Sequence, residues 1–297
     1  MDFNLAGLKD YVTDYLLALL FGIIEGITEF LPVSSTAHLR LAKALPYVHI
    51  PLTDPYWKMF DVVIQLGAVL CLPIYFRRRI KDFFTTFPVN PFTCKRDILN
   101  HPVVLVFIAF FVTAGPAFLL KKLISHNLES PQVIGSALLI GGIIMWVVDA
   151  LFVKPRTADI NRMNWLQAAW IGAVQILSAV FPGTSRSMAT IAAGQTAGLS
   201  RAAALEFSFF VSIPTIFAAT GYDLLKTLRP DSDTAALAAV SITAHQWLTL
   251  TIGFISSFFV AWAVVAWFMA WVRRRGFIPF AVYRIILGAA ILLLNMH

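Results

Sequence analysis

Six long apolar runs constrain this 297-residue chain more than any other feature of its sequence. Each run has about the 20 residues that an α-helix needs to cross the hydrocarbon core of a bilayer. The runs lie near 57–76, 101–124, 132–153, 203–225, 247–272 and 278–295. Two further apolar runs, 14–31 and 165–181, continue directly into segments that contain Pro, Ser and Thr.

The composition places the chain in a membrane. Only 13% of the residues are charged and the mean hydropathy is +0.76, too little polar surface for a soluble globule of this size. We therefore predict an all-α integral membrane protein with a single membrane domain over residues 1–297. The net charge of +7 does not indicate nucleic-acid binding, because basic residues such as Arg77–Arg79 and Arg273–Arg275 follow apolar runs, where they orient helices. No cleavable signal peptide is expected, since the first residues lack a basic region.

The chain also contains an internal repeat. A shift of 150 residues brings FGIIEGITEFLPVSSTAH (21–38) onto IGAVQILSAVFPGTSRSM (171–188). The shift pairs Gly22 with Gly172, Glu25 with Gln175, Pro32 with Pro182 and Ser35 with Ser185. Duplication explains this shared pattern better than chance similarity does. We predict repeat halves at about 14–153 and 165–295.

Loop charges indicate how the halves are oriented. If the segments 14–45 and 165–199 enter and return as re-entrant hairpins, each half crosses the membrane three times and the second copy is inverted. One face then holds 13 Lys and Arg residues and the other 8, whereas full crossings would give 12 and 10. The positive-inside rule favours the hairpins. We predict six transmembrane helices plus two re-entrant helical hairpins in an inverted repeat, with both termini outside and a midplane site between the hairpins.

The first repeat motif carries ionisable and hydroxyl groups at membrane depth. Glu25 and Glu29 are four residues apart, so a helix would present both on one face, at a cost of about 3 kcal/mol each at the bilayer centre. They therefore require a cation, a proton or water. Pro32 ends the helix and frees backbone amides around residues 34–36, which favours anion binding. His38 follows within one turn and is suited to proton transfer.

The second motif, PGTSRSMAT (182–190), repeats this design around an arginine. Gly183 can adopt a positive φ, and Arg186 offers a fork of donors that suits phosphate oxygens. An alternative role for Arg186, as a buried partner of Glu29, is compatible with phosphate binding. Further hydroxyls come from Ser185, Ser187 and Thr190. Together the two motifs indicate a phosphoryl-transfer site.

The two motifs support a family resemblance. E-x-x-x-E-F-L-P-V-S-S-T-A-H (25–38), P-G-T-S-R-S-x-x-T (182–190) and VVIQLGAVL (62–70) resemble the bacterial undecaprenyl-diphosphate phosphatases of the bacitracin-resistance type over most of the chain. The resemblance implies hydrolysis of undecaprenyl diphosphate to undecaprenyl phosphate and phosphate, which recycles the lipid carrier for peptidoglycan and envelope polysaccharide. It also implies a multi-pass protein of the bacterial inner membrane, with a metal-assisted site that opens to the periplasm.

The resemblance further implies roles for single residues. Glu25 and Glu29 would bind a divalent metal, Mg²⁺ or Ca²⁺, or handle water; Ser35 and His38 would act as nucleophile or base, and Arg186 would bind phosphate. Supporting phosphate donors would be Ser34, Thr36, Ser185, Ser187 and Thr190. From the spacing we expect His38 to remove a proton from Ser35 or from water, and the sequence leaves both nucleophiles open.

Two other classes of membrane protein share some of these features. A secondary transporter or flippase of an anionic or lipid-phosphate substrate would use inverted repeats and broken helices as well, but it does not need the hydroxyl cluster. The other lipid-phosphate phosphatase superfamily is rejected, because PSGH is absent and Ala192 stands where its second histidine would. The expected partners are a polyprenyl diphosphate and membrane lipids, not nucleic acid, and a homodimer is compatible with the sequence.

The remaining polar residues in apolar runs have simpler interpretations. Acidic residues outside the motifs are expected to be paired or solvated, and Arg284 to snorkel or to pair with an acid. These acids are Asp61, Asp149, Glu206 and Asp223. The two cysteines, Cys71 and Cys94, cannot form a disulfide framework or a metal site by themselves and are interpreted as incidental.

Overall fold

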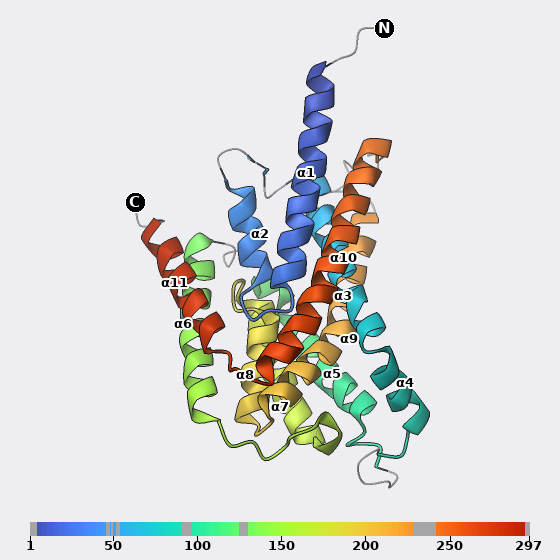
Figure 1. Ribbon diagram of the computed structural model, residues 1–297, viewed down its shortest axis with the longest axis vertical. Coiled ribbons are helices and arrows are strands. Elements are labelled where there is room, and N and C mark those ends of the chain that lie inside the picture. The colour runs from blue at the N-terminus through green and yellow to red at the C-terminus, as the bar shows by residue number, and fades with distance from the viewer. Residues whose placement is uncertain are drawn as a thin grey trace.

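The computed structural model shows a bundle of α-helices with both ends of the chain toward its upper end (Figure 1). It describes residues 5–45, 48, 50–51, 54–90, 97–124, 130–228 and 242–294. Cys94 therefore lies outside the described residues, as do Lys95, Arg96 and Arg229 of the charge count. The described residues form α-helices joined by short loops, with one 3-10 turn at Ile160–Arg162.

The helices follow the predicted apolar runs closely. They are α1 (Leu5–Thr28), α2 (Ser35–Lys43), α3 (Pro55–Tyr75), α4 (Arg77–Thr86), α5 (Pro102–Ile124), α6 (Pro131–Leu151), α7 (Trp165–Val180), α8 (Arg186–Thr196), α9 (Arg201–Leu228), α10 (Ala244–Val272) and α11 (Ile278–Leu294). The all-helical fold is thus confirmed.

Several helices begin at side chains that cap the free backbone N–H groups. Asp54 accepts a hydrogen bond from the Trp57 amide at the start of α3, and Ser130 accepts one from Val133 at the start of α6. Asn164 and Thr243 each form a capping box with a glutamine three residues later. These caps satisfy donors that a helix start otherwise leaves unpaired, so they fix the first residue of each helix.

Five helices are long and apolar enough to cross a membrane, which confirms a multi-pass membrane protein. The five are α3, α6, α10 and the segments Pro102–Leu119 of α5 and Arg201–Asp223 of α9. The sixth predicted span forms α11, which has only 17 residues, so the described residues do not provide a sixth full-length span. The segment expected from residue 14 already begins at Leu5, because polar residues such as Lys9 and Asp10 interrupt the apolar run without breaking the helix.

The two motif segments form helical hairpins that approach each other from opposite ends of the bundle. α1 and α2 lie toward the upper end and α7 and α8 toward the lower end (Figure 1). α1 packs against α10, and α7 packs against α5 and α8. α3 lies between α9 and α10, and α6 packs along α11. The first loop is buried over residues 29–34, and in the second loop Gly183 and Thr184 are buried while Phe181 is exposed.

The acidic residues outside the motifs have structural partners or lie in solvent, as predicted. Lys43 binds Asp61 with 2.6 Å between Nζ and Oδ2. The fully buried Asp149 accepts from Arg201 Nε at 2.6 Å, and Glu206 accepts from Arg79 Nε at 3.2 Å. The Asp223 side chain is exposed. None of these residues is needed to explain the site described below.

We predict that Gly172→Ala destabilises the protein by about 1–3 kcal/mol, the usual cost of overpacking. A Cβ at this position would collide with the Ala109 carbonyl oxygen and lie 2.9 Å from its Cα, both backbone atoms of α5 that cannot move aside. The matched control is Gly115→Ala, also in a helix, where a Cβ meets nothing within 4 Å. Thermal unfolding in detergent measures both, and equal melting temperatures would contradict the tight α5–α7 contact.

Candidate functional site

The loops of the two hairpins meet inside the protein. α1 ends at Thr28 and α2 begins at Ser35, while α7 ends at Val180 and α8 begins at Arg186. The Ser187 hydroxyl donates a hydrogen bond of 2.9 Å to the Leu31 carbonyl and so joins the second motif to the first. Residues that are about 150 positions apart therefore share one site.

Ser34 and Ser185 have the same unusual backbone and the same role. Their φ angles are 74° and 68°, in the left-handed region that non-glycine residues rarely adopt. Each is the N-cap of its helix, and each side chain accepts an amide hydrogen bond, Ser34 from Ala37 and Ser185 from Met188. Ser185 therefore corresponds to Ser34. The gapless alignment with Ser35 was wrong at this point, because the N-cap serine follows Pro182 by three residues but Pro32 by only two.

A carboxylate shared between the two motifs is the centre of the site. Glu29 Oε2 accepts from the Ser35 hydroxyl at 2.7 Å, and Glu29 Oε1 accepts from Arg186 Nη2 at 3.0 Å. The side chains of Glu29 and Arg186 are 6% and 12% exposed, so water screens this ion pair little. The pairing of Arg186 with Glu29 that the sequence suggested is confirmed. Arg186 also donates to the Ser208 carbonyl at 3.4 Å.

Glu25 lies one turn before Glu29 and is buried, with 1% of its surface exposed. Its Oε1 has no hydrogen-bond partner among the described residues, which is costly for a buried carboxyl group. Together with Glu29 and Ser35 it offers oxygen ligands only, the set that Mg²⁺ and Ca²⁺ prefer. Within the described part of the chain no three His, Cys, Asp or Glu side chains gather as a metal site. The residues thus fit a cation that keeps part of its shell for substrate oxygens or water.

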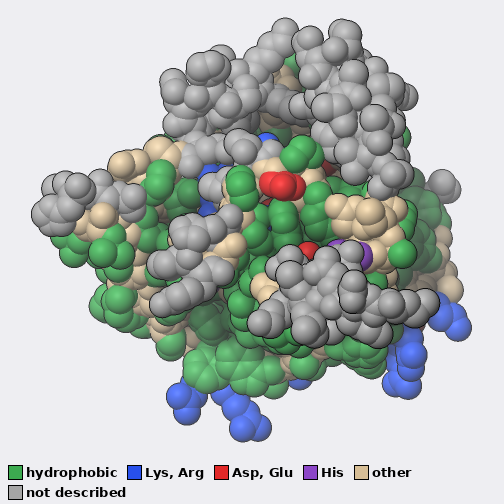
Figure 2. All heavy atoms as spheres, turned by 90° about the horizontal axis from the view of Figure 1, so that it is seen from above, with side chains coloured by type: hydrophobic (Ala, Val, Ile, Leu, Met, Phe, Trp, Pro, Cys, Tyr) green, Lys and Arg blue, Asp and Glu red, His purple; other side chains and the backbone are tan. Residues whose placement is uncertain are grey.

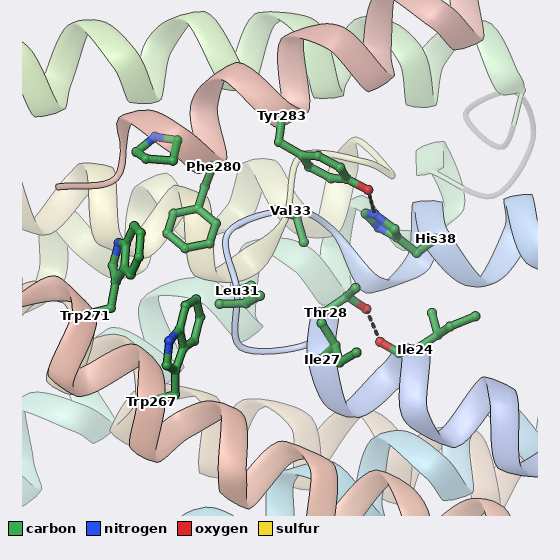
Figure 3. Close-up of a pocket in the computed structure, with 11 residues that line it drawn as sticks. Ile24, Ile27, Thr28, Leu31, Val33, His38, Trp267, Trp271, Phe280 and Tyr283 are labelled. Carbon is green, nitrogen blue, oxygen red and sulfur yellow. Dashed lines mark hydrogen bonds between the residues drawn. The ribbon is translucent and has the colours of Figure 1, made fainter. Parts of the chain in front are cut away.

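His38 contacts a different partner from the one expected. Its Nδ1 lies 2.7 Å from the Ser34 carbonyl, which can only accept, so Nδ1 carries the proton. Its Nε2 lies 2.6 Å from the Tyr283 hydroxyl (Figure 3). Ser35 donates to Glu29 instead. The expected His38–Ser35 pair is therefore wrong for this structure, because the α2 turn directs the imidazole toward α11.

Of the other hydroxyl residues that were predicted to bind phosphate, Ser185, Ser187 and Thr190 lie on α8 or at its N-cap, and Thr36 lies on α2. Ser185 and Ser187 lie 3.0 Å apart at the start of α8, and Thr190 lies 2.6 Å from the Ser208 hydroxyl. The Thr36 side chain is exposed. Sequence reasoning missed Ser208 and Tyr283, because both lie in long apolar helices and no local pattern marks them.

Arg284 was also misinterpreted. It is completely buried, and its guanidinium donates to backbone carbonyls instead of pairing with an acid. The acceptors are Pro32 at 3.2 Å, Ala137 at 3.1 Å, Gly183 at 3.1 Å and Thr184 at 3.0 Å. These carbonyls belong to the two motif loops and to α6. The sequence alone could not predict that the motif loops lie beside α11.

An apolar cavity of about 500 Å³ adjoins the site on the side of His38. Ile27 and Leu31 form one wall, Trp267 and Trp271 of α10 a second, and Phe280 and Tyr283 of α11 a third (Figure 3). His38, Tyr283 and Thr28 contribute its polar atoms. Such a cavity, apolar with a few polar groups at one side, is typical of a site for an amphiphilic ligand.

The comparison with known proteins identifies the family. Residues 18–290 match the family described as bacitracin resistance protein BacA. The chain belongs to this family. The loops of both hairpins lie inside the matched region, so the whole Glu29–Ser35–Arg186 cluster falls within it.

Three relatives of the chain have the same name. The undecaprenyl-diphosphatase of Koribacter versatilis is 63% identical over 94% of this chain and 97% of the relative. The undecaprenyl-diphosphatase of Rhizobium etli (strain CIAT 652) is 42% identical over 95% of this chain and 97% of the relative. The undecaprenyl-diphosphatase of Caldanaerobacter subterraneus subsp. tengcongensis is 38% identical over 93% and 94%.

We predict a strong energetic coupling between Glu29 and Arg186. Arg186→Met leaves a buried carboxylate without its cation and should destabilise the protein by about 3–5 kcal/mol, whereas Glu29→Gln combined with Arg186→Met should cost less than the sum of the single changes. Equilibrium unfolding of the two single variants and the double variant measures the coupling. Additive losses would mean that the pair contributes nothing to stability.

Proposed function

We propose that this protein hydrolyses undecaprenyl diphosphate to undecaprenyl phosphate and inorganic phosphate. The observation that supports this most is the Glu29 carboxylate, which binds the Ser35 hydroxyl of one motif and the Arg186 guanidinium of the other. Relatives at 63% and 42% identity are named for this activity. The reaction would recycle the lipid carrier for peptidoglycan and envelope polysaccharide, and bacitracin resistance follows from the family.

The terminal phosphate would bind where α2 and α8 begin. Ser35 and Arg186 are the first residues of these helices, and both reach the same carboxylate, so the two helix N-termini lie close together. Helix N-termini present free N–H groups and a positive partial charge, which suit phosphate. Arg186 would turn from Glu29 to the phosphoryl oxygens and stabilise the charge that develops as the anhydride breaks.

The geometry favours Glu29 as the proton acceptor. The Ser35 hydroxyl already donates to Glu29 Oε2 at 2.7 Å, so this carboxylate could take the proton of Ser35 or of a water in the same place. Attack on the terminal phosphorus breaks the bond to the bridging oxygen, and undecaprenyl phosphate departs with that oxygen. Direct attack by water gives phosphate in one step; attack by Ser35 gives a phosphoserine that water then hydrolyses.

A divalent cation fits the acidic part of this site. Glu25, whose Oε1 lacks a partner, and Glu29 would hold Mg²⁺ or Ca²⁺. Bound there, the ion would supply charge neutralisation for the diphosphate oxygens. Glu25 would otherwise carry an uncompensated negative charge beside the substrate.

The apolar cavity would take the first isoprene units of the lipid. It meets the polar site at His38, whose Nε2 is held by Tyr283, so the diphosphate of a lipid in the cavity would reach Glu29 past this imidazole. We assign His38 to the departing lipid phosphate, to which its Nε2 would donate a proton when the imidazole is doubly protonated and has released Tyr283. The apolar residues that line the cavity would then exclude water from the isoprenoid chain of the lipid.

The predicted inverted repeat is part of this proposal, and several correspondences support it. α1 packs on α10 as α7 packs on α5. Gly22 and Gly172 both allow this close approach, because a Cβ on either would collide with backbone atoms of the facing helix. A second cavity of about 520 Å³ between α6, α7 and α8 is lined by counterparts of the first, with Leu177 for Ile27, Phe181 for Leu31 and Ser136 for Tyr283.

The two cavities differ where the chemistry is proposed. Ala189 lines the second cavity at the position that His38 occupies in the first. We therefore place hydrolysis at the first cavity, on the hairpin that approaches from the upper end. We propose that this end faces the periplasm of the inner membrane. The loop charges support this, because in the predicted topology this end has 8 Lys and Arg residues and the other has 13. Acidic side chains are visible near the middle of this face (Figure 2). Homodimerisation stays a prediction.

The proposed function predicts phosphate release from undecaprenyl diphosphate by the purified protein in detergent. Glu29→Gln and Arg186→Ala should each reduce turnover by about 100-fold or more, because each removes charge that acts on the reacting phosphate. A chelator should abolish the activity and added Mg²⁺ or Ca²⁺ restore it. Arg78→Gln, which removes an exposed arginine of α4, is the matched control and should be fully active.

Folded wild-type protein without phosphate release would contradict the enzyme and favour the transporter. Unchanged activity in the presence of a chelator would contradict the metal but not the phosphatase.

The cavity predicts a separate effect on lipid binding. Trp267→Ala should raise KM about 10-fold for prenyl diphosphates with little change in kcat, since one large apolar contact with the chain is lost. Trp262→Ala is the control, because Trp262 is equally exposed on α10 but does not line the cavity. Steady-state kinetics with two chain lengths measure this, and equal KM values for both variants would contradict the assignment of the cavity.

A further inference from the structure

Arg284 is a buried cation without a buried anion. It lies in α11 with none of its surface exposed, and within the described part of the chain it forms no salt bridge. A charged group inside a membrane protein is costly unless hydrogen bonds compensate it. Its two terminal nitrogens bind four backbone carbonyls at 3.0–3.2 Å, while its Nε has no partner. The compensation thus comes entirely from backbone oxygens.

These carbonyls belong to the two motif loops and to α6. Pro32 lies in the first loop, Gly183 and Thr184 lie in the second, and Ala137 lies in α6. Loop carbonyls at membrane depth have no helical partner and cannot reach bulk water, so they need donors from the protein. One guanidinium with five N–H groups can serve several of them at fixed angles, which an ammonium cannot.

The surrounding helices leave space for this side chain. A Cβ on Gly141 of α6 would collide with Arg284 Nη2 and lie 3.3 Å from its Cζ. Gly141 therefore lets the guanidinium pass between α6 and α11 to the loops. The four carbonyls to which it donates hold the guanidinium in this place.

The loops held by Arg284 carry the reactive groups. Pro32 is two residues before the N-cap Ser34, and Thr184 directly precedes the N-cap Ser185. Displacement of either carbonyl would shift the start of α2 or α8, and with it Ser35 or Arg186. Both of these residues must reach Glu29, one on each carboxylate oxygen.

We propose that Arg284 is a positioning residue for the hydrolysis proposed above. It ties the loops of the two hairpins together so that Glu29, Ser35 and Arg186 stay in one site. It does not contact the substrate. This proposal rests on the proposed function. It adds the residue that keeps the two motif loops in position relative to each other.

The test compares Arg284→Gln and Arg284→Lys, each alone and combined with Arg186→Lys, by phosphate release from undecaprenyl diphosphate. Arg284→Gln should lower kcat about 100-fold, the usual effect of a misplaced reacting group, and leave KM within about threefold. Arg284→Lys should be intermediate, because it keeps the charge but reaches fewer carbonyls. Arg274→Gln, an exposed arginine in the turn before α11, is the control and should be unchanged.

The combined variants separate positioning from general stability. If Arg284→Gln already misplaces Arg186, then adding Arg186→Lys should cost much less than it costs in the wild type. If Arg284 only kept the protein folded, the two losses would multiply. Multiplied losses, or a normal kcat for Arg284→Gln, overturn the proposal.

A second variant covers the case in which Arg284→Gln does not fold. Gly141→Ala keeps Arg284 and its charge but displaces the guanidinium, so it should lower kcat and show the same reduced effect of Arg186→Lys. Gly115→Ala is its control. Inactive wild-type protein would contradict the proposed function and this proposal together, whereas active wild type with multiplied losses contradicts this proposal alone.

Discussion

Two helix breaks inside the helical bundle impose the constraint on which the rest of this structure depends. Each break frees backbone N–H and carbonyl groups that neither lipid nor bulk water can satisfy, so the protein must supply the partners itself. Side chains of Ser34 and Ser185 accept amides at the two helix starts, and Ser187 donates to the Leu31 carbonyl. Arg284 donates to three further loop carbonyls, those of Pro32, Gly183 and Thr184. The breaks can only exist where these donors and acceptors converge.

The same convergence creates the chemistry. Helix starts with free N–H groups attract phosphate, and placing two of them together doubles this attraction in a region with few competing waters. Glu29 offsets the cost of the positive groups while no substrate is bound, since its carboxylate holds Arg186 and Ser35 together. Substrate phosphate can replace the carboxylate as the partner of Arg186. In the proposed mechanism, the side chains that stabilise the structure without substrate would also act in catalysis.

The two hairpins bring different side chains to the site. The first hairpin supplies Glu25, Glu29 and His38, and the second supplies Arg186. The cavity beside the first hairpin has a histidine and a tyrosine, and the corresponding positions beside the second have Ala189 and Ser136. Arg284 is likewise present on α11, while α6 provides only the carbonyl of Ala137. In the proposed mechanism, the first hairpin would thus supply the acid–base groups and the second the anion-binding group.

The sequence by itself determined the membrane environment, the helices and the three residues, Glu29, Ser35 and Arg186, that the structure brings together. Apolar runs fix helices because a bilayer core allows no other local backbone, and Glu29 and Arg186 were recognisable because charges in such runs need a purpose. Tertiary structure alone decided the contacts. It paired the Ser35 hydroxyl with Glu29 and the His38 imidazole with Tyr283. It also made Ser34, and not Ser35, the structural counterpart of Ser185. The Arg284 guanidinium donates to carbonyls of both motif loops. These partners lie up to 252 residues apart, so no local pattern encodes them, and only the packing of α6, α10 and α11 around the hairpins brings them within hydrogen-bond distance.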